Sequence, residues 1–404
     1  MTRRERVLKA LAFEETDRAP LDLAGMASTG ISCFAYPSLV SALGLPARRP
    51  RVYDTGQMLA LPDLDVLDAL NIDVVTVMPD STNAFDQPGL WHAYDFNGRL
   101  PALVRDPGIF EPQADGTITQ PRYGRSMPPS AHVFEAEHGG QPFDLVGEIP
   151  RPDLTRLCEQ IAAHPFEAEE ARRIAEHCRR AREATDRAIL FCGPGAGIGI
   201  GGFTGIALFP LLCMTEPDYV AQLHETLTQH AVATLETLLP LIHPYIDVYL
   251  VSADDWGTQT QLVASPETYE ALFLPYYRRV NDVIHRFAPG VKTFLHSCGA
   301  VYGLIDLIIA SGFDVLNPVQ WTAGGHSFRD WKDKARGRIA LWGGGVNTQA
   351  TLPLGSIADI EREVAEVTSY MRKDGGYVFC AIHNLLAEIP GEKVAAMYRA
   401  AAAT

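Results

Sequence analysis

The chain has 404 residues, of which 47% are hydrophobic and 21% are charged, and its formal net charge is −15. This composition is typical of a globular protein with a sizeable core, built as one barrel or as two smaller domains. The negative charge argues against a nucleic-acid ligand, which needs a basic surface. No apolar run of about 18 residues occurs, so we expect no membrane span.

Cysteine usage and the start of the chain indicate the compartment. Seven cysteines, odd in number and widely scattered, are not typical of a disulfide framework. Glu5, Glu14 and Glu15 interrupt the basic start, so no signal peptide is predicted. We therefore expect a cytoplasmic protein whose reduced thiols serve in packing or metal binding. The oligomeric state is left open, a homodimer included.

The first part of the chain begins with regular elements and then becomes irregular. Apolar spacing predicts a helix over residues 3–13, a strand over 19–23, a helix over 62–70 and a strand over 74–78. From about residue 83 to 152, glycine and proline recur between short segments. This pattern predicts a loop and hairpin insertion that elaborates one face and has no core of its own.

From residue 153 onward, predicted helices and strands alternate. The predicted strands are 188–192, 247–252, 291–296, 314–317, 338–342 and 376–380, and the main helices between them are 166–185, 217–239, 266–287, 301–310 and 357–372. With the two earlier strands this makes about eight strand–helix units. We therefore predict an α/β fold, a single (β/α)8 TIM-type barrel over residues 1–404.

The unusual residues fall at the carboxyl ends of the predicted strands, where the chemistry of such barrels gathers. Several strand ends carry them, which predicts one shared pocket. These residues are the glycine-rich segment 193–205, Asp254 and Asp255, His296 and Cys298, Asn317, the segment 343–347 and the segment 380–384.

His296 and Cys298 are two positions apart where a strand ends, so their side chains point the same way. An imidazole and a thiol side by side are half of a zinc site, although both residues would also suit a core. Cys380 and His383 follow the last strand, and either one completes three ligands with an open fourth position. Two thiolate ligands would make the zinc softer and more electron-rich, which favours Cys380 as the third ligand. His383 would then lie next to the ligands or bind the substrate.

Adjacent carboxylates follow the predicted strand 247–252. Adjacent strand residues point oppositely, so either Asp254 or Asp255 faces the mouth, to transfer a proton or to hold a ligand, while the other caps or pairs nearby. Gly197 and Gly199 belong to a GxGxxG pattern that no acidic strand end follows, so we expect a loop that approaches a ligand closely or a plain turn. The substrate-binding candidates at these ends are Gly197, Gly199, Asn317, Asn347 and Asn384.

Five segments of the chain resemble the uroporphyrinogen decarboxylase superfamily. Together they extend over nearly the whole chain and are specific for this superfamily, whereas each segment alone is a loose match. They are RVLKALAFEETDRAP (6–20), SADDWGTQTQLVASPETYEALFLPYYRRV (252–280), HSCGAVYGLIDLIIASGFDVLNPVQ (296–320), GGGVNTQATLPLGS (343–356) and GGYVFCAIHNLLAEIPGEKVAAMY (375–398).

The resemblance implies one of two chemistries. Metal-free decarboxylases of the superfamily hold a tetracarboxylate with an arginine-rich N-terminal segment, whereas residues 23–31 here contain no arginine. Corrinoid-linked methyltransferases carry zinc on His-x-Cys and a later Cys. His296 and Cys298 match the first two ligands, and alignment on the Pro390–Glu392 segment puts His383 in the third place. Asn347 stands where relatives commonly have Asp.

We therefore expect a zinc-dependent methyltransferase that uses a corrinoid held on a partner protein. Its small-molecule substrate would be an aryl methyl ether, a methylated amine or a thiol, and Asp254 or Asp255 would supply or accept the proton. One alternative is a metal-free decarboxylase of a pyrrole-like or aromatic acid. Another is a sensor or binding protein built on the same barrel.

Overall fold

The computed structural model describes residues 1–80, 82–136, 149–201 and 204–404. A parallel sheet lies at its centre, with the strand order β14-β13-β12-β11-β10-β9-β3. In chain order these strands are β3 (Val74–Val77), β9 (Ala188–Phe191), β10 (Val248–Ala253), β11 (Lys292–His296), β12 (Val315–Asn317), β13 (Ala340–Trp342) and β14 (Tyr377–Val378). The strands are short and mostly buried, as expected for a parallel sheet that is covered on both faces.

The segment around Leu21 takes the eighth place in the ring of strands. Leu21 forms a parallel bridge with Phe379, just after β14, and its carbonyl accepts the N–H of Asp73, just before β3. Both edges of the sheet are thereby joined, and the prediction of a TIM-type barrel is confirmed. The predicted strand 19–23 shrinks to this bridge, and Pro20 has no N–H to lengthen the pairing.

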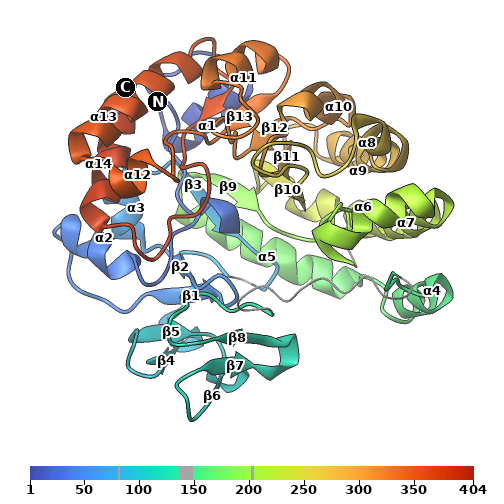
Figure 1. The fold of residues 1–404 in the computed structure, drawn as a ribbon, viewed down its shortest axis with the longest axis horizontal. Helices are drawn as coiled ribbons and strands as arrows, with labels where there is room; N and C mark the ends of the chain where they lie inside the picture. The colour runs from blue at the N-terminus through green and yellow to red at the C-terminus, as the bar shows by residue number, and fades with distance from the viewer. Residues whose placement is uncertain (81, 137–148, 202–203) are drawn as a thin grey trace.

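Helices surround the sheet (Figure 1). They are α1 (Arg3–Leu11), α2 (Tyr36–Ala42), α3 (Leu64–Ala69), α4 (Leu154–Ala163), α5 (Ala168–Ala184), α6 (Gly205–Thr215), α7 (Pro217–Ile242), α8 (Pro266–Leu272), α9 (Leu274–Phe287), α10 (Ile305–Ala310), α11 (Phe328–Ala335), α12 (Thr351–Leu354), α13 (Ile357–Met371) and α14 (Gly391–Ala402). The predicted helix 266–287 is divided into α8 and α9 next to Pro275, which lacks the N–H that a continuous helix would use. Within the described residues, no helix combines the length and the apolar character that crossing a membrane requires.

Two small sheets lie beside the barrel, at the lower edge of Figure 1. The four-stranded sheet is mixed, and the three-stranded sheet is antiparallel. Their strands are β1 (Arg51–Asp54), β2 (Leu59–Leu61), β4 (His92–Tyr94) and β5 (Ala102–Val104) in one sheet, and β6 (Glu111–Pro112), β7 (Ile118–Gln120) and β8 (Arg125–Met127) in the other. Phe96, Phe110 and Met127 belong to the same apolar cluster as the barrel helices. Residues 137–148 of the predicted insertion lie outside the described residues.

The barrel interior is a separate apolar cluster. It contains alternate residues of the strands, such as Ala188 and Leu190 of β9, because successive side chains of a strand point to opposite faces. Val7 and Leu11 of α1 belong to the same cluster. Cys380 follows Val378 with the same alternation and is part of this interior.

Candidate metal centre

His296 is the last residue of β11. Asn317 is the residue paired with it in the neighbouring strand β12. The Asn317 Nδ2 donates to the carbonyl oxygen of Trp342 at 2.7 Å, so its Oδ1 is the acceptor that faces His296 Nδ1 at 2.6 Å. His296 Nδ1 therefore carries the proton, and Nε2 keeps a free lone pair. Burial lowers the pKa of His296, which favours the neutral ring that a metal ligand requires.

Cys298 lies in a tight turn that two glycines allow. Gly299 has φ +86°, and a Cβ on it would lie 2.2 Å from the backbone of Gly257. The Gly257 N–H in turn donates to the Cys298 carbonyl at 3.1 Å, and the Asp255 carboxylate accepts the Cys298 N–H at 2.8 Å. This close approach fixes the Cys298 backbone. Burial, together with the Asp255 carboxylate, raises the pKa of the Cys298 thiol, so a bound cation would be needed to stabilise its thiolate.

His383 comes from the loop after β14 and is oriented in the same way as His296. Asn384 Nδ2 donates to Gln57 Oε1 at 2.9 Å, so Asn384 Oδ1 is the acceptor that lies 2.8 Å from His383 Nδ1. The loop is also tied to the N-terminal region by the parallel bridge between Leu385 and Ile31. His383 Nε2 is thereby left as the free lone pair.

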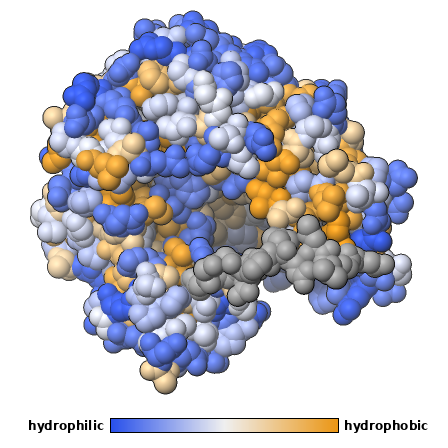
Figure 2. All heavy atoms as spheres, in the orientation of Figure 1, coloured by the Kyte–Doolittle hydropathy of each residue, from blue (hydrophilic) through white to orange (hydrophobic). Residues whose placement is uncertain are grey.

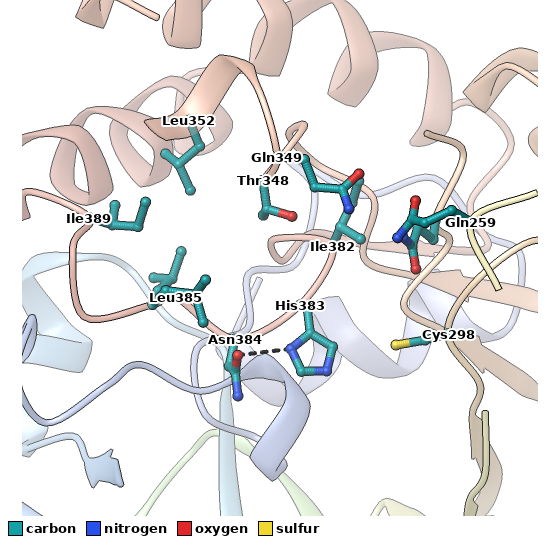
Figure 3. A pocket seen from close by; sticks show the side chains of 12 residues that line it. Gln259, Cys298, Thr348, Gln349, Leu352, Ile382, His383, Asn384, Leu385 and Ile389 are labelled. Atoms are coloured by element: carbon teal, nitrogen blue, oxygen red, sulfur yellow. Dashed lines mark hydrogen bonds between the residues drawn. The ribbon is translucent and has the colours of Figure 1, made fainter. Parts of the chain in front are cut away.

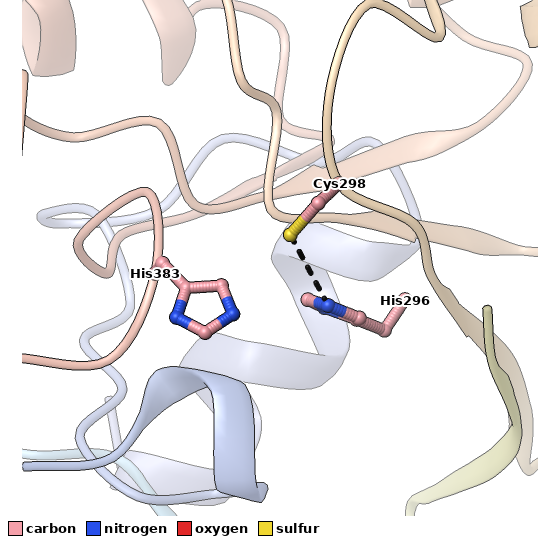
Figure 4. A group of neighbouring side chains, drawn as sticks. All are labelled: His296, Cys298 and His383. Carbon is pink, nitrogen blue, oxygen red and sulfur yellow. Dashed lines mark hydrogen bonds between the residues drawn. The ribbon is translucent and has the colours of Figure 1, made fainter. Parts of the chain in front are cut away.

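The structure brings His296, Cys298 and His383 together (Figure 4). Their ligand atoms all lie within 4.8 Å of one another, and His296 Nε2 is 3.4 Å from Cys298 Sγ. A tetrahedral zinc with usual bond lengths would hold its nitrogen and sulfur ligands about 3.6 Å apart. Two imidazole nitrogens and one thiolate sulfur are donors that zinc prefers, with a fourth position for a reactant. The described side chains therefore fit a catalytic zinc site.

Cys380 lies elsewhere. Its side chain is buried in the barrel interior, and its Sγ accepts a long hydrogen bond of 3.8 Å from Asn317 Nδ2. Burial raises the pKa of this thiol well above its ordinary range. Cys380 contacts the amide that orients His296 and is absent from the group of ligand atoms formed by the described residues.

Asp254 and Asp255 follow β10 and have different surroundings. Asp254 is buried and accepts the N–H groups of Ile200 and Gly201, which ties the glycine-rich loop to β10. Burial raises its pKa to about 6. Asp255 is half exposed, and its carboxylate lies 3.5 Å from His296 Nε2. A Cβ on Gly199 would lie 2.9 Å from the Asp254 carboxyl group, so a larger residue there would displace this carboxylate.

Two cavities meet at the three candidate ligands, and Figure 2 shows this face of the molecule hollowed. The first, the uncharged cavity, has a volume of about 320 Å³. It is lined by Gln259, Cys298, Gln320, Thr348, Gln349, Leu352, Ile382, His383, Asn384, Leu385, Leu386 and Ile389. The second, the carboxylate cavity, has a volume of about 640 Å³. It is lined by Ser28, Gln57, Gly197, Ile198, Gly199, Gly201, Ile206, Ala253, Asp254, Asp255, His296 and His383.

A third cavity, of about 400 Å³, lies on another side of the His383 loop and includes residues 132–135 in its lining. His383 borders all three cavities. The loop after β14 is therefore the wall that the cavities share.

The remaining predicted site residues divide into cavity and framework positions. Gly197 and Gly199 line the carboxylate cavity, and Asn384 lines the uncharged cavity. Asn317 is fully buried beneath His296. Asn347 shapes its own loop, because its Oδ1 accepts the N–H groups of Gln349 and Ala350. Residues 202–203 of the predicted glycine-rich segment lie outside the described residues.

No sequence motif predicted the glutamines of the site. Gln57 is 327 positions from Asn384, and no local pattern links the two. Only the position of Gln320, just after the predicted strand end at Asn317, indicated that it could lie near the site. Its Oε1 accepts the Gly299 N–H at 2.8 Å.

Comparisons with known proteins agree with this architecture. A model of the family described as uroporphyrinogen decarboxylase (URO-D) matches residues 158–404. A uroporphyrinogen decarboxylase from Syntrophotalea carbinolica is 26% identical over 183 residues, which are 44% of this chain and 47% of that protein. The match thus spans about half of the relative's length. A methyltransferase from Methanosarcina mazei shares the fold, with a TM-score of 0.55 and 15% identity over 100% of this chain and 99% of that one.

Proposed function

The chain belongs to the uroporphyrinogen decarboxylase family, and from this premise we propose that it is a zinc-dependent methyltransferase. It would move a methyl group between a small methylated molecule and a corrinoid carried by a partner protein. We propose His296, Cys298 and His383 as the zinc ligands and assign Cys380 to the support of His296 through Asn317.

The main support for this proposal is the position of the three candidate ligands, which lie between two cavities. Cys298 faces the smaller uncharged cavity, His296 faces the larger carboxylate cavity, and His383 borders both. A transfer reaction needs two reactants to meet at one point, and holding both there lowers the entropic part of the barrier. The smaller cavity suits the methylated molecule, and the wider one suits access by the corrinoid.

The side chains have separate tasks in this proposal. Asn317 and Asn384 keep the Nε2 atoms of His296 and His383 free to bind a cation. Asp255 holds the Cys298 turn and, with Asp254, can give a proton to the heteroatom or take one from it. The aliphatic residues of the uncharged cavity exclude water from the reacting atoms.

A zinc ion bound by these residues would supply Lewis acidity to the heteroatom that loses or gains the methyl group. In the demethylation direction, the bond between the heteroatom and the methyl carbon breaks, and its electron pair stays on the heteroatom. The new bond joins the methyl carbon to the reduced cobalt of the corrinoid substrate, which provides both electrons. The heteroatom is then protonated from a neighbouring carboxyl group or from water.

A decarboxylase is the second candidate, and the name of the Syntrophotalea carbinolica relative favours it. A polycarboxylate substrate needs cationic partners in its pocket, because an unpaired buried charge is costly. The described residues that line the three cavities around His383 include no lysine or arginine. This lining supports the methyltransferase over a decarboxylase of a polycarboxylate.

The test is a zinc measurement combined with an assay. Protein purified without added metal should contain about one zinc per chain, and anomalous diffraction at the zinc edge should place it between His296, Cys298 and His383. Free cob(I)alamin should then accept methyl groups in the presence of a suitable donor. A metal-free protein that releases CO₂ from a pyrrole-like or aromatic acid would reject the proposal in favour of the decarboxylase.

A further inference from the structure

In the uncharged cavity, leucine and isoleucine side chains gather at an apolar end, and two glutamine amides, with Ile382 beside them, lie at a polar end (Figure 3). Leu352, Leu385 and Ile389 lie together at the end far from Cys298. Gln259 and Gln349 lie nearer the sulfur, where their neutral amides face the same space. A molecule that fills the cavity therefore meets aliphatic groups around its body and neutral hydrogen-bonding groups next to the candidate metal ligands.

Gln320 adds a donor of known orientation to the polar end. Its Oε1 accepts the Gly299 N–H at 2.8 Å, so the amide cannot be turned round without losing that hydrogen bond. Gln320 lines the cavity, and its Nε2 makes no hydrogen bond to the described residues. An oxygen or sulfur acceptor on the ligand would satisfy this donor.

Apart from Cys298 and His383, the described residues of the lining have no ionisable side chain. Among its residues, none is Asp, Glu, Lys or Arg, and none is Phe, Tyr or Trp. An ammonium ion buried there would have no carboxylate and no aromatic face to replace its hydration. The carboxylates of Asp254 and Asp255 belong to the lining of the other cavity.

We infer that the uncharged cavity selects a neutral methyl ether or methyl thioether with an apolar body, in preference to a methylated ammonium. This inference rests on the proposed function for the methyl group, but the binding preference does not require transfer to occur. The volume of about 320 Å³ is at the lower end of the usual range for ligand pockets, which suits a small molecule.

The test compares two ligands that share a phenyl body and differ in charge. Methoxybenzene and phenyltrimethylammonium are titrated into the zinc-loaded full-length protein and followed by calorimetry. Methoxybenzene should bind more tightly than the ammonium by about tenfold or more, because the ammonium loses its hydration without a partner. Tighter binding of the ammonium, or no binding of methoxybenzene, overturns the inference.

Matched variants locate the binding. Thr348→Phe places a ring in the uncharged cavity and should weaken methoxybenzene binding by about tenfold or more, whereas Ile206→Phe in the carboxylate cavity should leave it within about twofold. Gln349→Glu replaces an exposed amide with a carboxylate of the same shape and should shift the preference toward phenyltrimethylammonium. The reverse result for the two phenylalanine variants, or an unchanged ionic preference in Gln349→Glu, contradicts the assignment.

The two hypotheses fail in different ways. If methoxybenzene binds as expected and no donor delivers methyl groups to cob(I)alamin, the cavity assignment stands and the methyltransferase proposal is rejected. If methyl transfer occurs with a clear preference for an ammonium donor over the ether, the methyltransferase proposal stands and the cavity assignment is rejected.

Discussion

The two ends of the barrel use charged residues in opposite ways. At the amino end of the strands, Asp73 is fully buried and contacts both Arg6 and Arg18 at 2.7 Å. Asp247 at the start of β10 is paired with Arg4 at 2.7 Å in the same manner. At the carboxyl end, the carboxylates of Asp254 and Asp255 share a cavity lining with imidazoles, and the described residues of this lining include no lysine or arginine.

This difference indicates that the charged residues at the amino end serve stability and that those at the carboxyl end serve chemistry. The paired charges at the amino end satisfy one another, so they hold the closed ring and offer little to a ligand. The imidazole and thiol groups at the carboxyl end are oriented by neighbours but keep their lone pairs free. We therefore expect substitutions at one end to change stability with little effect on metal content, and substitutions at the other end to do the reverse.

The largest expected effect is loss of the proposed metal site. Cys298→Ser should lower the zinc content from about one per chain to about 0.1 or less, and methyl transfer by about a thousandfold, because a ligand and its negative charge are lost. Metal analysis by mass spectrometry gives the content. Cys158→Ser, at an exposed thiol, is the control and should keep the zinc. Full occupancy in Cys298→Ser would exclude this residue as a ligand.

The matching change at the amino end should act on folding. Asp73→Asn leaves Arg6 and Arg18 without their shared buried carboxylate, and we expect a loss of about 3–5 kcal/mol in the free energy of unfolding. Asp17→Asn removes a half-exposed partner of Arg6 and should cost about 1 kcal/mol or less. Urea denaturation measures both. Zinc content should be the same in the two proteins, and a drop in Asp73→Asn under folded conditions would contradict the separation.

An intermediate effect should separate residues that orient a ligand from residues that shape a loop. Asn384→Ala removes the acceptor of His383 Nδ1 and should weaken zinc binding by about 10–100-fold with little change in stability. Competition with a chelator gives the affinity. Asn347→Ala changes the same residue type at a neighbouring strand end and should leave the affinity unaltered. Equal affinities in both variants would show that Asn384 does not orient a zinc ligand.

The smallest expected effect concerns pH and a buried lysine at the amino end. Burial lowers the pKa of Lys332 to about 8 in the folded protein. Between pH 8 and the higher pKa of this lysine in the unfolded chain, the unfolded chain therefore holds a proton that the folded chain has released. Stability contributed by this group therefore rises with pH in that window, by about 1 kcal/mol between pH 8 and 9. Lys332→Met should lack this increment, and Lys9→Met, at an exposed position, should keep it. Parallel slopes in wild type and Lys332→Met would argue against the shift.

The barrel and half of the candidate site follow from local patterns. Alternating strand and helix periodicity predicted the ring, because each unit buries its apolar face in the same way along the chain. His296 and Cys298 could be paired from the sequence because the two-residue period of a strand places them on one side. The Gly299 turn that fixes Cys298 lies next to them in the sequence.

The choice between Cys380 and His383 depended on the tertiary structure. Cys380 has the same alternation as Val378 and points into the apolar interior, where its sulfur accepts a long hydrogen bond from the Asn317 amide. His383 lies three residues later, on a loop whose direction is set by Gln57 and Ile31 from the other end of the chain. The sequence alone thus determined which strands end at the mouth and which residues leave β11 together. Hydrogen bonds between distant segments decided which residue of the last loop meets them, because no local period fixes the path of a loop.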